Sequence, residues 1–104
     1  MTSNALKNRD EKEIRRLRSE LPVLKTSFGV RKIGIFGSVA RGEDKPSSDI
    51  DVLVEFEDNK ATFRNFMGLI SFLEEIFGRK VDLVTTNGID KYLRPHIEKE
   101  VIWC

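Results

Sequence analysis

The chain has 104 residues, a formal net charge of +1, a hydrophobic content of 39% and a charged content of 34%. This length allows one modest hydrophobic core, so we expect a single domain over residues 1–104. The composition excludes a disordered chain, and the lack of any run of about 18 apolar residues excludes a membrane span. The single cysteine, Cys104, excludes an internal disulfide. Because the N-terminus has no apolar signal segment, we expect a cytoplasmic protein.

The near-neutral total conceals an uneven distribution of charge. Residues 1–33 contain nine Lys or Arg and four Asp or Glu, whereas residues 34–104 contain nine and thirteen. The basic part could contact nucleic acid, or it could be a solvated helix face. Proteins that bind duplex nucleic acid usually carry a larger basic excess without an acidic remainder. We therefore favour the solvated face and expect no nucleic-acid partner.

The first predicted element is a helix over residues 9–27. Its apolar residues recur three and four positions apart and form one buried stripe. The stripe consists of Ile14, Leu17, Leu21 and Leu24. Pro22 interrupts the pattern and can bend or divide the helix, because proline has no backbone donor. Gly29 is placed to cap the C-terminus of the helix.

A short apolar run over residues 32–36 predicts a buried strand that ends in a tight turn. Gly37 and Ser38 form this turn, and Ser38 is expected to cap a short helix over residues 39–41. A glycine lets backbone N–H groups approach a phosphate closely, and the start of a helix adds donors and a positive dipole. Arg41 can place further donors beside the same anion. The sequence therefore predicts a phosphate-binding turn.

A second strand is predicted over residues 50–54, and two aspartates stand at its start. Asp49 and Asp51 are two positions apart, so in a strand both carboxylates project from one face. Aspartate is depleted in strands and like charges repel each other, which indicates a bound cation. Paired carboxylates suit Mg²⁺, which also takes oxygen ligands from a substrate phosphate.

A long helix is predicted over residues 62–77, where Gly78 stops it. One apolar stripe is expected to face the sheet and consists of Phe63, Phe66, Met67, Ile70, Leu73 and Phe77. A second stripe consists of Leu69, Phe72 and Ile76. The two stripes together are wider than one packing contact needs. The second stripe is therefore interpreted either as an interface or as part of a wide core face.

The third predicted strand, over residues 81–85, carries Asp82. A right-handed crossover through the long helix would make this strand parallel to the second one. If Asp82 then lies on the same face as Asp49 and Asp51, three carboxylates converge. Such a group could bind two metal ions about 3.5–4 Å apart, one at the attacking oxygen and one at the leaving group.

The last predicted element is a helix over residues 90–102, which Pro95 could break. Its expected buried residues are Tyr92, Leu93, Ile97 and Val101. His96 is the only histidine, and we expect it on the surface rather than in catalysis or at a metal. The order helix, strand, strand, helix, strand, helix predicts a small α/β or α+β domain, with a mixed sheet flanked by helices.

The motifs together resemble the signature of the polymerase-beta-type nucleotidyltransferase superfamily. The matching residues are Gly37-Ser38-Val39-Ala40-Arg41-Gly42 and Ser48-Asp49-Ile50-Asp51. A Gly-Ser turn, an aspartate pair or one strand aspartate alone has an ordinary structural explanation, but all three at this spacing form a specific signal. With Asp82 as the third acid and so short a chain, the sequence most resembles the minimal nucleotidyltransferases, the MNT antitoxins paired with HEPN toxins. The resemblance extends from about Arg31 to the C-terminus.

The resemblance implies a polymerase-beta-like fold and transfer of AMP from Mg-ATP to a protein acceptor, a tyrosine of a cognate HEPN toxin. The implied catalytic and metal-binding residues are Asp49, Asp51 and Asp82, which would hold two Mg²⁺ ions. The implied nucleotide-binding residues are Gly37, Ser38, Arg41 and Ser48. About a hundred residues leave little surface to grip a base or an acceptor, so a partner or a homo-oligomer is expected to supply specificity.

Two other functions stay open at this point. The chain could be an antitoxin that neutralises its toxin by binding alone, with the site idle. It could also be a small-molecule nucleotidyltransferase of the aminoglycoside-modifying kind, although such chains carry a further domain for the acceptor.

Overall fold

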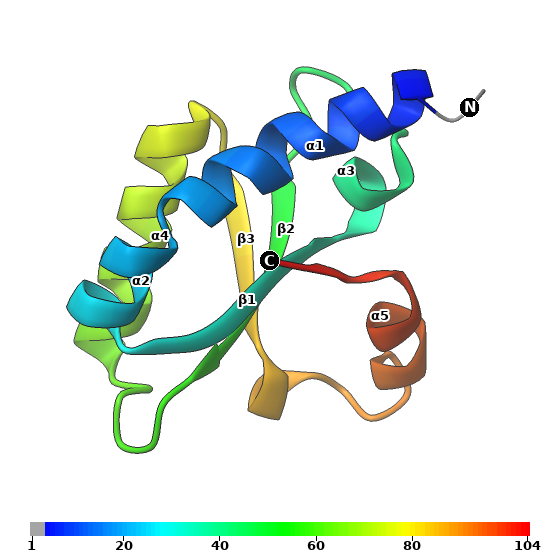
Figure 1. Ribbon diagram of the computed structural model, residues 1–104. Coiled ribbons are helices and arrows are strands. Elements are labelled where there is room, and N and C mark those ends of the chain that lie inside the picture. The colour runs from blue at the N-terminus through cyan, green and yellow to red at the C-terminus, as the bar shows by residue number, and fades with distance from the viewer. Residues whose placement is uncertain (1–3) are drawn as a thin grey trace.

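The computed structural model describes the backbone of residues 4–104 and the side chains of residues 12–104. Its centre is a four-stranded sheet with the order β3-β2-β1-β4, flanked by helices (Figure 1). The strands are β1 (Val30–Phe36), β2 (Ile50–Phe56), β3 (Val81–Thr85) and β4 (Ile102–Trp103). β1 is antiparallel to β2 and β4, whereas β2 and β3 are parallel. The mixed sheet with its helices confirms the expected fold class.

The helices lie mostly on one side of the sheet. They are α1 (Asn4–Ser19), α2 (Leu21–Phe28), α3 (Gly37–Arg41), α4 (Phe63–Phe77) and α5 (Arg94–Glu100), with a 3₁₀ turn, η1 (Thr86–Gly88), after β3. α1, α2 and α4 lie next to one another, whereas α5 lies apart from them beside the C-terminal strand (Figure 1). No helix in the described part of the chain combines the length and the apolar composition needed to cross a bilayer.

The expected first helix is divided in two, as Pro22 allowed. α1 ends at Ser19, and α2 begins at Leu21 with Pro22 in its first turn, where its missing N–H costs nothing. Gly29 then caps α2 with a positive φ of 68°, and its N–H donates to the carbonyl of Leu24. The predicted cap is therefore confirmed.

The hydrophobic core lies between one face of the sheet and the group of α1, α2 and α4. Ile50, Val52 and Val54 alternate along β2 and are fully buried in this core. The helices contribute Ile14, Leu17, Leu24, Leu69 and Leu73. Burial of each such side chain stabilises the fold by roughly 1.5–3 kcal/mol. The core thereby fixes which residues of each strand point to the opposite face.

The second stripe of α4 packs in or against this core, which supports its interpretation as part of a wide core face. Leu69 is fully buried, and Ile76 packs against the core cluster. The ring of Phe72 lies 5.5 Å from the ring of Phe28, centroid to centroid. The physical reason is α2, which packs beside α4 and covers the side of the helix that carries Phe72.

The first stripe of α4 faces the core only in part. Leu73 is fully buried, and Phe66, Ile70 and Phe77 are half-buried against the core. Phe63 at the start of the helix is 80% exposed, and Met67 is 44% exposed. The limits of the helix itself are as expected, because Thr62 caps its start and Gly78 its end.

The C-terminal segment differs most from the expectation. α5 begins at Arg94 with Pro95 in its first turn, so Pro95 starts the helix instead of breaking it. Tyr92 and Leu93 were expected to be buried but are 76% and 55% exposed, because they lie in a surface turn ahead of α5. Ile97 and Val101 are half-buried, and His96 is exposed.

A fourth strand follows α5, which the sequence did not predict. Ile102 and Trp103 pair with Ile35 and Gly34 of β1. Gly34 is required at this contact, because a Cβ atom there would lie 2.7 Å from the carbonyl oxygen of Ile102. Two strand residues are too few for a periodic pattern to reveal.

Substitution of Phe72 tests whether the second stripe is core. Phe72→Glu should lower the free energy of unfolding by about 2 kcal/mol or more, because it places a charge against Phe28. Phe63→Glu is the matched control on the same helix and should have little effect, because Phe63 is exposed. Urea unfolding followed by circular dichroism measures both, and equal stability of the two variants would contradict the assignment.

Candidate active site

The parallel pairing of β2 and β3 brings Asp51 and Asp82 side by side. The two residues are direct partners in the register of these strands. Their neighbours in sequence, such as Val52 and Leu83, point into the core, so both carboxylates lie on the opposite face of the sheet. Asp49 stands one residue before β2 and is exposed. The crossover through α4 therefore places the third acid next to the aspartate pair, as the sequence predicted.

Negative charge is concentrated at Asp51, which is half-buried. Its pKa is raised above the ordinary value of 3.8, mainly because burial disfavours the charged form and then because Asp82 and Asp49 carry like charges nearby. Glu100 raises this pKa further, and Arg41 opposes the shift. The carboxylates thus repel one another, and a nearby cation would relieve that repulsion.

The donor set fits Mg²⁺ in its chemistry, though not as a finished cage. All three side chains offer carboxylate oxygens, the hard ligands that Mg²⁺ prefers. In the described part of the chain, no three His, Cys, Asp or Glu side chains form a group that could hold a metal ion on their own. Mg²⁺ commonly binds one or two carboxylates and completes its shell with water and substrate phosphates. Asp51 and Asp82 can supply those two carboxylate ligands, and Asp49 lies close by.

The turn at Gly37 lies directly against Asp51. Gly37 has a φ of 75°, which residues other than glycine adopt only under strain. A Cβ atom at this position would also collide with the Asp51 carboxylate. Glycine is therefore required here by both the backbone and the neighbouring acid.

The expected cap at Ser38 is wrong. α3 begins at Gly37, its N-cap is Phe36, and no side chain caps it by a hydrogen bond. Ser38 lies inside the first turn because the helix starts at Gly37, two residues before the expected start at Val39. The backbone N–H of Gly37 instead donates to Oε1 of Glu100, at 2.9 Å.

Arg41 lies at the end of α3 between two carboxylates. Its Nε donates to Oε1 of Glu43 at 3.0 Å, and its Nη1 donates to Oε2 of Glu100 at 3.0 Å. The hydrogen bond to Glu43 is the largest cause that raises the pKa of Arg41 above its ordinary value, and the hydrogen bond to Glu100 is the next. Glu100 therefore contacts both groups that the sequence predicted as phosphate donors, Gly37 and Arg41.

The loop ahead of Asp49 is held by Arg79. Nη2 of Arg79 donates to the carbonyl oxygens of Ser48 and Lys45, at 2.7 and 3.0 Å. Nη1 forms an ion pair with Asp44 at 3.1 Å, and both side chains are largely buried. The hydroxyl of Ser48 accepts a hydrogen bond from the N–H of Lys45. Ser48 thus stabilises the loop, and its contact with a nucleotide stays a prediction.

The sequence alone does not mark Glu100 or Arg79 as parts of this site. Glu100 is 63 residues away from Gly37 along the chain, and no local pattern distinguishes it from the other acids of the last helix. Arg79 follows the cap of α4 directly, but its partners lie more than thirty positions earlier. Only the path of the folded chain brings these residues to the site.

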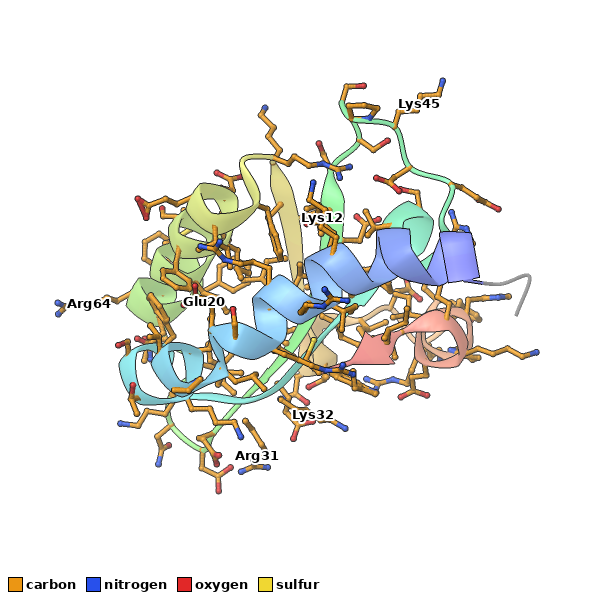
Figure 2. The ribbon with its side chains drawn as sticks, turned by 45° about the horizontal axis from the view of Figure 1, so that its top comes forward. Lys12, Glu20, Arg31, Lys32, Lys45 and Arg64 are labelled. Atoms are coloured by element: carbon orange, nitrogen blue, oxygen red, sulfur yellow. The ribbon has the colours of Figure 1, made fainter. Side chains whose placement is uncertain are left out.

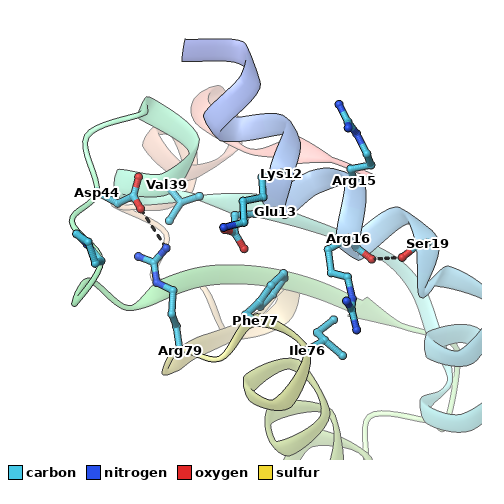
Figure 3. A pocket seen from close by; sticks show the side chains of 11 residues that line it. Lys12, Glu13, Arg15, Arg16, Ser19, Val39, Asp44, Ile76, Phe77 and Arg79 are labelled. Carbon is cyan, nitrogen blue, oxygen red and sulfur yellow. Dashed lines mark hydrogen bonds and ion pairs between the residues drawn. The ribbon is translucent and has the colours of Figure 1, made fainter. Parts of the chain in front are cut away.

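A cavity of about 950 Å³ lies elsewhere, between α1 and the C-terminal end of α4 (Figure 3). Its lining includes Lys12, Arg16 and Phe77, and the Asp44–Arg79 ion pair stands at one side. None of the three predicted catalytic aspartates lines it. The candidate site is therefore an open acidic cluster beside α3 and not this cavity.

The basic side chains of the N-terminal part point in several directions. Lys12 projects from α1, whereas Arg31 and Lys32 project from β1 at another side of the molecule (Figure 2). Arg31 forms ion pairs with Glu55 and Glu57 at 3.3 and 3.1 Å. The ammonium group of Lys32 lies 4.3 Å from the centre of the Trp103 ring. Arg31 and Lys32 are thus engaged in contacts within the protein.

Alanine at Gly37 tests the contact between the turn and Asp51. Gly37→Ala and the control Gly78→Ala both place a side chain at positive φ, which costs roughly 1–2 kcal/mol. A Cβ atom at Gly78 meets open space. Gly37→Ala should therefore lower the free energy of unfolding by about 1–3 kcal/mol more than the control, because of its collision with Asp51. Equal losses in urea unfolding would show that the two groups are not in contact.

The charge of Asp51 predicts a pH-dependent stability. A raised carboxyl pKa means that the folded protein binds the proton of Asp51 more tightly than the unfolded chain does. The charged carboxylate therefore destabilises the fold. This destabilisation is complete above the raised pKa and disappears as the pH falls toward 3.8. In EDTA at pH 7, Asp51→Asn should raise the midpoint of thermal unfolding, and the gain should shrink in acid. Asp58→Asn is the control, because that carboxylate is 94% exposed. A less stable Asp51→Asn protein at pH 7 would refute the repulsion.

Comparisons with known proteins identify the family of this chain. The family model for the nucleotidyltransferase domain matches residues 14–104. The protein adenylyltransferase MntA of Thermococcus cleftensis is 40% identical over 80 residues, which cover 77% of this chain and 80% of that protein. A Methanocaldococcus jannaschii protein, provisionally named a protein adenylyltransferase, is 44% identical over 89 residues, which cover 84% of this chain and 89% of that protein.

Solved structures show the same fold. One chain, described provisionally as a minimal nucleotidyltransferase, superposes with a TM-score of 0.75 and 35% identity, over 88% of this chain and 92% of its own length. A complex of a tri-AMPylated Shewanella oneidensis HEPN toxin with its MNT antitoxin gives a TM-score of 0.57 and 21% identity, over 94% of this chain and 70% of the other. At that identity the likeness concerns the fold alone. From the family model and these relatives, the chain belongs to the nucleotidyltransferase domain family and is a nucleotidyltransferase.

Proposed function

We propose that this nucleotidyltransferase transfers AMP from Mg-ATP to a tyrosine hydroxyl of a HEPN toxin and thereby acts as its antitoxin. The observation that carries the proposal is the pairing of Asp51 with Asp82 directly beside the turn at Gly37. This places acidic oxygens next to N–H donors, the two environments that a metal-bound triphosphate needs. Relatives named as protein adenylyltransferases support a protein as the acceptor.

The acids and the donors have separate tasks in this proposal. Asp49, Asp51 and Asp82 would hold up to two Mg²⁺ ions. The N–H of Gly37, the hydroxyl of Ser38 and the guanidinium of Arg41 would bind phosphate oxygens of ATP. Mg²⁺ held there would neutralise negative charge and polarise the phosphoryl oxygens of the phosphate that is attacked. Arg79 and Ser48 keep the loop that carries Asp49 in place.

The reaction is a substitution at the α-phosphorus of ATP. The tyrosine oxygen forms a bond to that phosphorus, the bond from it to the bridging oxygen breaks, and pyrophosphate leaves. The proton of the tyrosine hydroxyl passes to a carboxylate, and Asp82 is suited to accept it because it is exposed beside Asp51. The raised pKa of Asp51 reflects the same concentration of negative charge.

The acceptor is assigned to a partner protein because the site is open. Asp49 and Asp82 are exposed, and the described cavity of 950 Å³ lies elsewhere. A small-molecule acceptor is usually enclosed by a pocket. A tyrosine presented by a folded partner brings its own surroundings and needs no such pocket. The HEPN toxin seen with an MNT antitoxin of the same fold suggests the class of that partner.

The test is transfer of AMP to a cognate HEPN toxin supplied as purified protein. After incubation with Mg-ATP, mass spectrometry should show adducts of AMP mass on that protein. The Asp49→Asn/Asp51→Asn double variant should lower the rate by several orders of magnitude, because it removes the metal-holding charges at constant shape. The control Asp58→Asn removes an exposed charge outside the site and should keep the native rate.

Neutralisation of the toxin separates catalysis from binding alone. The native chain should protect cells from the toxin, and the double variant should not, although both should bind it. If the toxin's mass stays unchanged and the double variant still neutralises it, the chain acts by occlusion and the enzymatic proposal is wrong.

A further inference from the structure

The carboxylate of Glu100 lies where the proposed nucleotide would place a phosphate. Oε1 accepts a hydrogen bond from the N–H of Gly37 at 2.9 Å, and Oε2 accepts one from Nη1 of Arg41 at 3.0 Å. One carboxylate thus joins a backbone donor at the start of α3 to a guanidinium at its end. An anion held by these two kinds of donor is what a phosphate-binding turn provides.

The backbone after α5 has an anchor other than this contact. Glu100 is the last residue of α5, and the chain continues through Val101 into β4, whose pairing with β1 fixes the backbone. The side chain of Glu100 is 28% exposed and that of Arg41 is 46% exposed. Rotation of the Glu100 side chain could therefore release both donors while the helix and the strand stay where they are.

Glu100 also adds negative charge to a site that is already acidic. It lies close enough to Asp51 to act on that carboxylate, together with Asp82 and Asp49. A triphosphate that approached the occupied turn would meet four carboxylates, and both donors would be engaged. After Glu100 leaves, the same donors face the triphosphate and one like charge is removed.

We infer that Glu100 occupies the phosphate-binding turn of the nucleotide-free protein and that ATP binds by displacing it. This inference rests on the proposed function, because it assigns the same donors to the phosphates. The competition is between two anions for Gly37 and Arg41, so it lowers the affinity for any nucleoside triphosphate irrespective of its base. The free energy of the Glu100 contacts is subtracted from that of nucleotide binding.

Glu100→Gln tests the competition, because it keeps the size of the side chain and removes its charge. Isothermal titration calorimetry with Mg-ATP should show affinity higher by about tenfold for this variant than for the native protein, within the usual range of coupling between two ligands. Glu98→Gln is the control. It removes a charge from the same helix, where Glu98 pairs only with Arg94 at 3.6 Å among the described ion pairs, and should leave the affinity unchanged.

A second variant distinguishes the contribution of Arg41 from that of the Gly37 N–H. Glu43→Ala frees the Nε of Arg41 and leaves Glu100 on Gly37, so its gain in affinity should be smaller than that of Glu100→Gln. If Glu100→Gln does not fold, Glu100→Asp takes its place. Its shorter carboxylate cannot span both donors, and it should also bind Mg-ATP more tightly than the native protein.

The outcomes are distinct. Tighter binding of Mg-ATP to the Glu100 variants, with native affinity in Glu98→Gln, supports the displacement. Equal or weaker binding overturns it and makes Glu100 a residue that positions Arg41 for the nucleotide, and the proposed function then stands. If the native protein and every variant fail to bind Mg-ATP, the proposed function fails together with this inference.

Discussion

The parallel pairing of β2 with β3 is the interaction on which the rest of the structure depends. Its register makes Asp51 and Asp82 neighbours, and a slip of one residue would turn one of the two carboxylates into the core. The register is fixed by the apolar residues on the other face, such as Val52 and Leu83, which must stay buried. The packing of an ordinary hydrophobic core therefore sets the geometry of the acidic site.

The site combines groups that are unfavourable for stability when no ligand is bound. Asp51 is half-buried among like charges, and Gly37 has a left-handed backbone directly beside it. Arg41 offsets part of this charge and is itself held by Glu43 and Glu100. Stability at this end of the sheet and the capacity to bind a charged ligand are thus opposed, as is common where a fold carries chemistry.

The sequence was sufficient for much of the fold and for the aspartates, because local patterns carry that information. Apolar runs marked three strands, glycines marked the helix ends, and the crossover rule placed Asp82 beside Asp51. Two features that the sequence did not decide depend on contacts between distant segments, whereas the mistakes at Ser38 and Pro95 concern only where a helix starts. The position of α2 places Phe28 against the half-buried Phe72, and the return of the chain through α5 brings Glu100 to Gly37. Neither contact leaves a periodic signal in the sequence.

The bonds from Arg79 restrict the length of the loop between α3 and β2. Surface loops usually tolerate insertions, because closing a slightly longer loop costs little entropy. Here one guanidinium binds the carbonyl oxygens of Lys45 and Ser48 together with the carboxylate of Asp44, so the spacing of these groups must match a rigid planar fork. An added residue would pull at least one of them out of reach and shift Asp49 relative to β2. Length variation in proteins built this way should therefore accumulate in other connections, such as the turn between β2 and α4.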